Sequence, residues 1–447
     1  MATISKQGTT VGGAAAGLSP GVAVRARVST APLWYLYAAL AAFVLFATGL
    51  VPLAPEALNG TLTPHVLALV HVATLGLLTT AIMGALWQLL PVILVVPAPA
   101  SWLARAHFPL WVGGVALLVA GFWSAWWPAL AAGGTLVVLG ALFFAGVMWG
   151  TIARAPRRPL SAYFVAASLL DLVLVVLGGL ALAVDLQTGV LGAWFVRVLP
   201  AHLLLGLVGW GVGTVLGVSY KLAPMFALAH LGDERPGWVC FGLFNSGLVG
   251  LAASLLAGWP APVGFACAAL ILLALLVFAL DTLRLLRARH KKALEPTQWH
   301  ALSGLAALLL CGGGSLGAAL GGEDWWLDGR TATVLGLLFL LGFVGQTILG
   351  YLYKIVPFLV WNHRYAPLVG RQAVPLMRDL VQQRVASRTF FLYNAGLVAL
   401  LAALLWAPQA SGPAAAVVAL ATWIAGANLA WVLRRQIALS RPRTQNE

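Results

Sequence analysis

The stretch GVSYKLAP, from Gly217 to Pro224, occurs in two related forms elsewhere in the chain. GYLYKIVP ends at Pro357, and GALWQLLP ends at Pro91. The three prolines are separated by equal intervals of 133 residues (224 − 91 and 357 − 224). Each copy lies at the end of a long apolar run, so the same helix ending recurs at constant spacing. This regularity predicts a chain built from three similar units.

The composition is that of a polytopic membrane protein. Apolar residues make up 61% of the 447 residues and charged residues only 9%, and the mean hydropathy is +0.95. A soluble domain could not bury so much apolar surface. The net charge of +14 is spread between the apolar runs rather than clustered. It therefore indicates contact with a membrane surface, and no nucleic-acid partner is expected.

A helix needs about 20 apolar residues to span a membrane. The second, sixth and tenth runs of that kind are the longest, and each ends in the quoted motif. The fold class is therefore all-α, with twelve transmembrane helices. The predicted spans are 33–53, 64–92, 108–128, 130–152, 160–183, 198–227, 238–258, 261–286, 299–320, 331–360, 389–407 and 413–433.

The distribution of charge predicts the orientation. With twelve spans and a cytosolic N-terminus, 24 of the 26 Lys and Arg residues fall in cytosolic segments, and only Arg197 and Arg330 lie outside. Such an excess of positive charge is typical of cytosolic loops. Both termini are therefore expected in the cytosol, and the membrane is expected to be the inner (plasma) membrane. The basic segment 364–388 predicts a short helix on the inner surface, with anionic membrane lipid as its partner and protein docking as the alternative.

The period of the motif divides the twelve spans into three four-helix repeats, 31–158, 159–295 and 296–436. Cytosolic tails are expected at 1–30 and 437–447. Repeats with the same topology are related by an axis along the membrane normal, which predicts a pseudo-threefold bundle.

Two glycines recur in each of the three long spans, 15 and 7 residues before the proline. Small residues eight apart lie on nearly one helix face. These glycines allow either close packing of a neighbouring helix or the close approach of a flat ligand. The glycines are Gly76, Gly209 and Gly342, and Gly84, Gly217 and Gly350.

The motif aromatic and Lys/Gln positions are expected to anchor the span at the cytosolic boundary, where the proline ends it.

Three arcs of four helices, with spans 2, 6 and 10 ending in Gly-x-x-aromatic-x-x-x-Pro, resemble subunit I of the heme-copper oxidase superfamily. That superfamily includes cytochrome oxidases and nitric oxide reductases. The NnrS family, a twelve-span group tied to nitric oxide tolerance, is similar in size and layout. The resemblance implies heme and copper as cofactors, and histidine ligands toward the outer side of spans 2, 6, 7 and 10.

Only part of that ligand set is present. His71 lies 20 residues before Pro91, at the position that resembles the low-spin heme ligand. His202 lies 22 residues before Pro224, close to the copper-ligand position. Span 10 has Leu335 and Leu337 where two histidines are expected, and span 7 has no His pair. The sequence therefore excludes a standard terminal oxidase.

His71 and His202 are thus candidate heme ligands, with His202 also a candidate metal ligand. The alternative is that each is an intramembrane polar residue bonded to a neighbouring helix. Their two-residue difference in register, roughly half a helical turn, favours one heme on either over a heme that bridges both. His65 is interpreted as a rim residue at the outer mouth, with a metal entry site as the alternative. Other histidines, including His107 and His300, are interpreted as interface residues.

Asp171 lies in the middle of a span, in SLLDLVLVV. An ionised group at that depth costs about 3 kcal/mol on insertion scales. Asp171 is therefore a candidate proton carrier or substrate contact, and a neutral, hydrogen-bonded carboxyl is the alternative.

These observations support a membrane heme- or metal-binding protein in redox or nitric oxide chemistry, with respiratory-chain or oxidase subunits as possible partners. Two other classes stay open: a transporter without cofactor, and an oxidase assembly or scaffold subunit. The sequence does not decide whether the chain is an enzyme.

Overall fold

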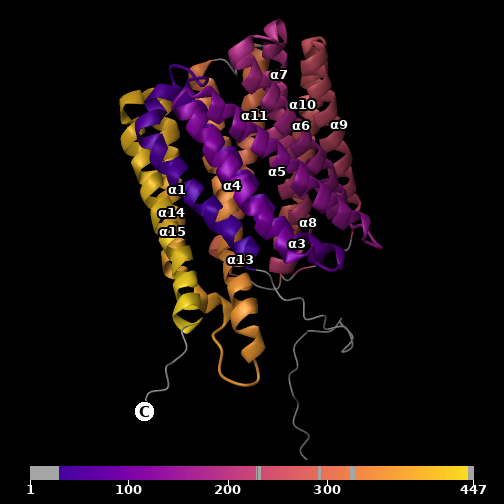
Figure 1. Cartoon of the computed structure of the whole chain (residues 1–447), viewed down its shortest axis with the longest axis vertical. Helices are drawn as coiled ribbons and strands as arrows, with labels where there is room; N and C mark the ends of the chain where they lie inside the picture. The colour runs from indigo at the N-terminus through magenta and orange to yellow at the C-terminus, as the bar shows by residue number, and fades with distance from the viewer. Residues whose placement is uncertain (1–29, 228, 230–232, 290–292, 323–327, 441–447) are drawn as a thin grey trace, which may run out of the picture.

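A computed structural model describes residues 30–227, 229, 233–289, 293–322 and 328–440 (Figure 1). In this part of the chain twelve helices are long and apolar enough to cross a membrane, which confirms the predicted number of spans. The described elements are all helices of the α, π or 3-10 type. The predicted tail 1–30 lies outside the described residues except for Thr30.

Four spans fall in each predicted repeat. In 31–158 they are α1 (Ala31–Ala57), a composite of α2 (Pro64–His71), η1 (Val72–Thr79) and α3 (Thr80–Leu94), then α4 (Ser101–Trp123) and α5 (Trp127–Ala153). In 159–295 they are α6 (Leu160–Thr188), a composite of η2 (Gly192–Trp194), α7 (Phe195–Leu203), η3 (Leu204–Val212) and α8 (Gly213–Ala227), then α9 (Arg235–Ala257) and α10 (Ala261–Arg287).

The remaining spans follow the same order. They are α11 (Pro296–Gly321), a composite of α12 (Gly329–Leu337), η4 (Leu338–Gly345) and α13 (Gln346–Arg364), then α14 (Gln383–Trp406) and α15 (Ser411–Ser440), with the 3-10 turn η7 (Pro408–Ala410) before α15. α15 thus continues into the predicted tail 437–447, and residues 441–447 lie outside the described part. α1 begins and α15 ends at the same end of the bundle (Figure 1), which is called the termini end below.

Two local predictions differ from the structure. The third span begins at Ser101 and ends at Trp123 instead of covering 108–128. The chain turns at Ser124–Trp126, where Ala125 has a positive φ of 50°, and Pro128 then starts the next helix. The surface helix predicted within 364–388 is replaced by two 3-10 turns, η5 (Ala366–Leu368) and η6 (Met377–Leu380). Pro367 and Pro375, both within this segment, interrupt the backbone hydrogen bonds that a longer helix would need.

The three long spans meet around a small apolar cavity of about 70 Å³. Residues at equal distances before the three motif prolines line it, so each span contributes the same positions. The matching sets are Ala81, Thr214 and Thr347; Ile82, Val215 and Ile348; Ala85, Val218 and Tyr351; and Leu89, Leu222 and Ile355.

The motif glycines lie where the first helix of each predicted repeat crosses the second. A Cβ atom placed on Gly84 would lie 2.6 Å from the Cβ of Tyr35. The corresponding distances are 2.3 Å from Gly217 to Phe164 and 2.9 Å from Gly350 to His300. Such distances are shorter than non-bonded carbon contacts allow. Helix packing therefore fills this face, and there is no room there for a flat ligand.

The glycines eight residues earlier make the same kind of contact. Gly76 packs on Ala42, Gly209 on Asp171 and Gly342 on Ala307. Each partner lies seven residues, or two turns, beyond the partner of the motif glycine on the same helix. The two contacts fix both the crossing point and the register of the helix pair.

The motif prolines do not end their helices, contrary to the sequence prediction. α3, α8 and α13 continue past Pro91, Pro224 and Pro357 to Leu94, Ala227 and Arg364. A proline removes one backbone hydrogen bond, to the residue four before it, and the last turns retain the others.

The motif aromatics are also less exposed than predicted. Trp87 and Tyr353 are only 5% and 6% exposed, so they are packed between helices. Tyr220 is half-buried, and its hydroxyl donates to Asp281 at 3.4 Å. The Lys354 ammonium pairs with Glu295, which precedes α11.

The glycine contacts generate a stability prediction. Gly217→Ala is expected to lower the free energy of unfolding by about 1–3 kcal/mol, because the added methyl group overpacks the crossing with Phe164. The measurement is thermal unfolding of the purified protein in mild detergent. Gly242→Ala is the control, since a Cβ on Gly242 meets no atom within 4 Å. Equal melting temperatures for the two variants would contradict the packing role.

Candidate functional site

Both candidate histidines lie immediately before a π-helical segment. His71 is the last residue of α2 and precedes η1, while His202 lies near the end of α7, just before η3. The π segments of the three long spans begin 19, 20 and 19 residues before their prolines (91 − 72, 224 − 204 and 357 − 338). Short π segments occur frequently at functional sites.

The imidazole of His71 is held by its own helix. Its Nδ1 lies 2.7 Å from the carbonyl oxygen of Leu67, and its ring stacks on Phe122 with 4.9 Å between centroids. A carbonyl can only accept, so Nδ1 carries the hydrogen and donates it. In a neutral imidazole Nε2 then has the free lone pair.

The imidazole of His202 is held in the same way, by a neighbouring span. Its Nδ1 donates to the carbonyl of Val175 in α6 at 3.0 Å. The ring lies against Gly179, where a Cβ would be only 2.9 Å from the ring Cε1. Nε2 is again the nitrogen with the free lone pair. Metal-bound histidines usually donate a hydrogen bond of this kind from the ring nitrogen that does not bind the metal.

The spans that carry these two histidines are in contact. Trp210 of η3 donates to the hydroxyl of Thr79 of η1 at 3.1 Å.

His65 has a different environment. It lies at the start of α2, with Nδ1 3.7 Å from a carboxylate oxygen of Glu56 and its ring 4.7 Å from that of Trp123. It is half exposed, as a rim residue would be. Among the described residues no group of three or more His, Cys, Asp or Glu side chains is placed to hold a metal ion. The described chain therefore does not form a metal centre with three such ligands around His65 or His202.

Asp171 lies on the same helix interface as His202. It is 8% exposed, and its carboxylate faces Gly209 of η3, where a Cβ would be 2.7 Å from Oδ2. Val175, which holds His202, is one turn further along α6. Within the described part of the chain the Asp171 carboxylate has no hydrogen bond or ion pair, so the hydrogen-bonded alternative has no partner there.

A buried polar cluster was missed by the sequence interpretation. His300, expected at an interface, is fully buried on α11 and donates from Nδ1 to the side-chain oxygen of Gln346. Gln346 in turn donates to Asn394 at 2.7 Å, and Nε2 of His300 has no partner in the described structure. The signal was a lone glutamine within the apolar run 331–360.

His107 was likewise expected at an interface and is instead 1% exposed. It is bonded to Tyr35 at 2.7 Å and to the carbonyl of Gly140 at 3.0 Å. Both of its nitrogens are therefore occupied, so His107 has no free lone pair for a ligand.

Comparison with known proteins finds no matching family model and no curated protein of significant similarity.

The environment of Asp171 generates a second prediction. Asp171→Asn is expected to be at least as stable as the wild type at neutral pH, because it removes a buried carboxylate that has no partner and keeps its shape. Thermal unfolding in detergent measures this. Ser168→Ala, one turn earlier on the same helix face, is a matched control for local packing. A melting temperature well below that of the wild type would mean that the carboxylate has a stabilising partner, such as a bound cation.

Proposed function

We propose that the chain is a membrane heme protein with the three-repeat architecture of heme-copper oxidase subunit I, and that His71 or His202 supplies an axial nitrogen. The equal motif intervals, the matched lining of the central cavity and the repeated glycine contacts support the three-repeat architecture. The function is redox or nitric oxide chemistry, through electron transfer or the binding of a small gas.

One observation carries the heme proposal. Two histidines on contacting spans each donate Nδ1–H to a backbone carbonyl, and each keeps an Nε2 lone pair. Heme iron needs only one or two protein ligands. This donor set therefore suits heme better than a metal ion that requires three or four protein ligands.

Bound heme would supply one-electron chemistry or a site for a small gas. The chain's own residues prepare that site. The carbonyl of Leu67 and the ring of Phe122 hold the imidazole of His71, and the carbonyl of Val175 holds that of His202. Asp171 is the proposed proton carrier or substrate contact beside them.

Copper is the second candidate cofactor. His202 resembles a copper-ligand position, and His65 is the proposed entry residue. Copper would need further ligands than these two, and the described residues offer no third His, Cys, Asp or Glu in a suitable group. Leu337, at the same distance from its proline as His71, leaves the third long span without a ligand at that position.

The proposed setting is the inner membrane with both termini in the cytosol, and respiratory-chain or oxidase subunits are the proposed partners. An oxidase assembly subunit is the second candidate function, because the motif glycines serve helix packing and would persist without a cofactor. A transporter has less support, since the central cavity is small and apolar.

Absorption spectra test the heme proposal. The protein is expressed with heme available, purified in mild detergent, and measured in oxidised and reduced forms together with its metal content. A Soret band is expected, and it should weaken in His71→Ala or His202→Ala, since that variant removes an iron ligand. His363→Ala is the control, because His363 is an exposed histidine at the termini end.

A colourless protein without stoichiometric metal would refute the heme proposal. Copurification of that colourless protein with an oxidase would instead favour the assembly subunit. A Soret band that survives in both single variants and in the double variant would leave heme bound but would refute these ligands.

The orientation is tested separately. Single cysteines introduced at Arg157 and Arg371 should react with a membrane-impermeant maleimide only in inverted vesicles, and a cysteine at Val190 only in right-side-out vesicles. All three positions are exposed. The reverse pattern would contradict cytosolic termini.

A further inference from the structure

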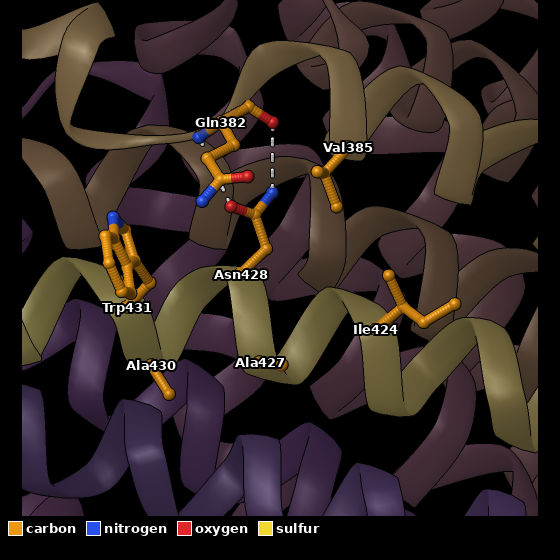
Figure 2. Close-up of a pocket in the computed structure, with 7 residues that line it drawn as sticks. All are labelled: Gln382, Val385, Ile424, Ala427, Asn428, Ala430 and Trp431. Atoms are coloured by element: carbon orange, nitrogen blue, oxygen red, sulfur yellow. Dashed lines mark hydrogen bonds between the residues drawn. The ribbon is translucent and has the colours of Figure 1, made fainter.

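A pocket of about 370 Å³ lies between the start of α14 and the stretch of α15 from Ile424 to Trp431 (Figure 2). Its walls are apolar and come from Val385 of α14 and from Ile424, Ala427 and Ala430 of α15. Trp431 forms one end. The pocket is independent of the histidine site, since none of its lining residues belongs to the spans that carry His71 or His202.

The polar groups on the pocket floor are already engaged with each other. The side-chain amide of Asn428 donates to the carbonyl of Gln382 at 3.2 Å, and its oxygen accepts from the Gln382 backbone N–H at 3.2 Å (Figure 2). This pair joins α15 to the start of α14. The pocket therefore presents mainly apolar surface to an occupant, which suits a hydrocarbon chain.

The pocket lies where a lipid of one leaflet would reach it. α14 and α15 stand with α1 at one edge of the bundle (Figure 1). From Ile424 to Trp431 the pocket follows α15 for about 10 Å toward the termini end. Trp431 is 40% exposed, and half-exposed tryptophans are enriched at the depth of lipid headgroups.

Two exposed arginines lie close in sequence to the pocket residue Val385 on α14. Arg384 and Arg388 lie within one helical turn of Val385, and both are exposed. Neither has an ion pair in the described part of the chain. Arg378, exposed on η6, is 3.7 Å from Asp379, the acidic residue of this segment.

We propose that this pocket binds an anionic phospholipid of the leaflet at the termini end. One acyl chain lies against Val385, Ile424 and Ala427, and the phosphate lies near Arg384 and Arg388. Apolar walls beside unpaired guanidinium groups match a molecule with a hydrocarbon chain and a negative headgroup. An inorganic anion would leave the walls empty, and a zwitterionic lipid would leave the arginines without a net negative partner.

Lipid-dependent stability tests the proposal. The full-length protein is purified in mild detergent, and its melting temperature is followed as phosphatidylglycerol or phosphatidylcholine is added. Phosphatidylglycerol is expected to stabilise the wild type at a lower concentration than phosphatidylcholine. Arg384→Gln and Arg388→Gln should each raise the half-maximal phosphatidylglycerol concentration about fivefold.

Two further variants distinguish lipid binding in the pocket from a general effect of surface charge. Arg157→Gln removes an exposed arginine from the α5–α6 loop, far from the pocket in sequence, and should leave the half-maximal concentration unchanged. Ala427→Phe keeps every charge but fills the pocket from an exposed position, and should abolish the preference for phosphatidylglycerol.

Three results would overturn the proposal. They are equal stabilisation by the two lipids, equal effects of Arg157→Gln and Arg384→Gln, and a stabilisation that inorganic phosphate reproduces. A cysteine introduced at Ala427 can be modified with a cross-linker that carries a bromoacetyl group. Reaction of that group with the chain's own residues 1–29 would show instead that a protein segment occupies the pocket.

Discussion

The architecture depends on how closely helix backbones approach at six glycines. Within a membrane, helices gain little from apolar burial against one another, because lipid is equally apolar. Their association depends on van der Waals contact, which requires small residues at the crossing points. Two such points per pair fix angle and register together, as Gly209 and Gly217 do against Asp171 and Phe164. The long spans are thereby held around a common centre.

The candidate site follows from this placement. The crossing at Gly209 brings α6 against η3, so the carbonyl of Val175 can hold His202 and the carboxylate of Asp171 lies in the same interface. The π segments contain the first glycine of each pair, Gly76, Gly209 and Gly342, so this tight helix contact extends into the part of each long span that follows the histidine positions.

Much of the fold could be predicted from the sequence, because membrane spans are encoded in local composition. The motif that ends at Pro224, with its two related copies, indicated which three spans occupy equivalent positions in the bundle. The π segments were not predictable, since no composition distinguishes them from α-helix. The burial of His300 was missed because its partner Gln346 lies 46 residues away.

The central cavity shows what a single chain permits that an assembly of identical subunits does not. At one level around the cavity the three spans present Ala85, Val218 and Tyr351. The Tyr351 hydroxyl reaches across to Ser219 of the neighbouring span at 2.6 Å. Three identical tyrosines could not share that space, and three alanines would leave it empty. Covalent linkage of unequal segments lets one large side chain fill a centre that a symmetric trimer would leave crowded or hollow.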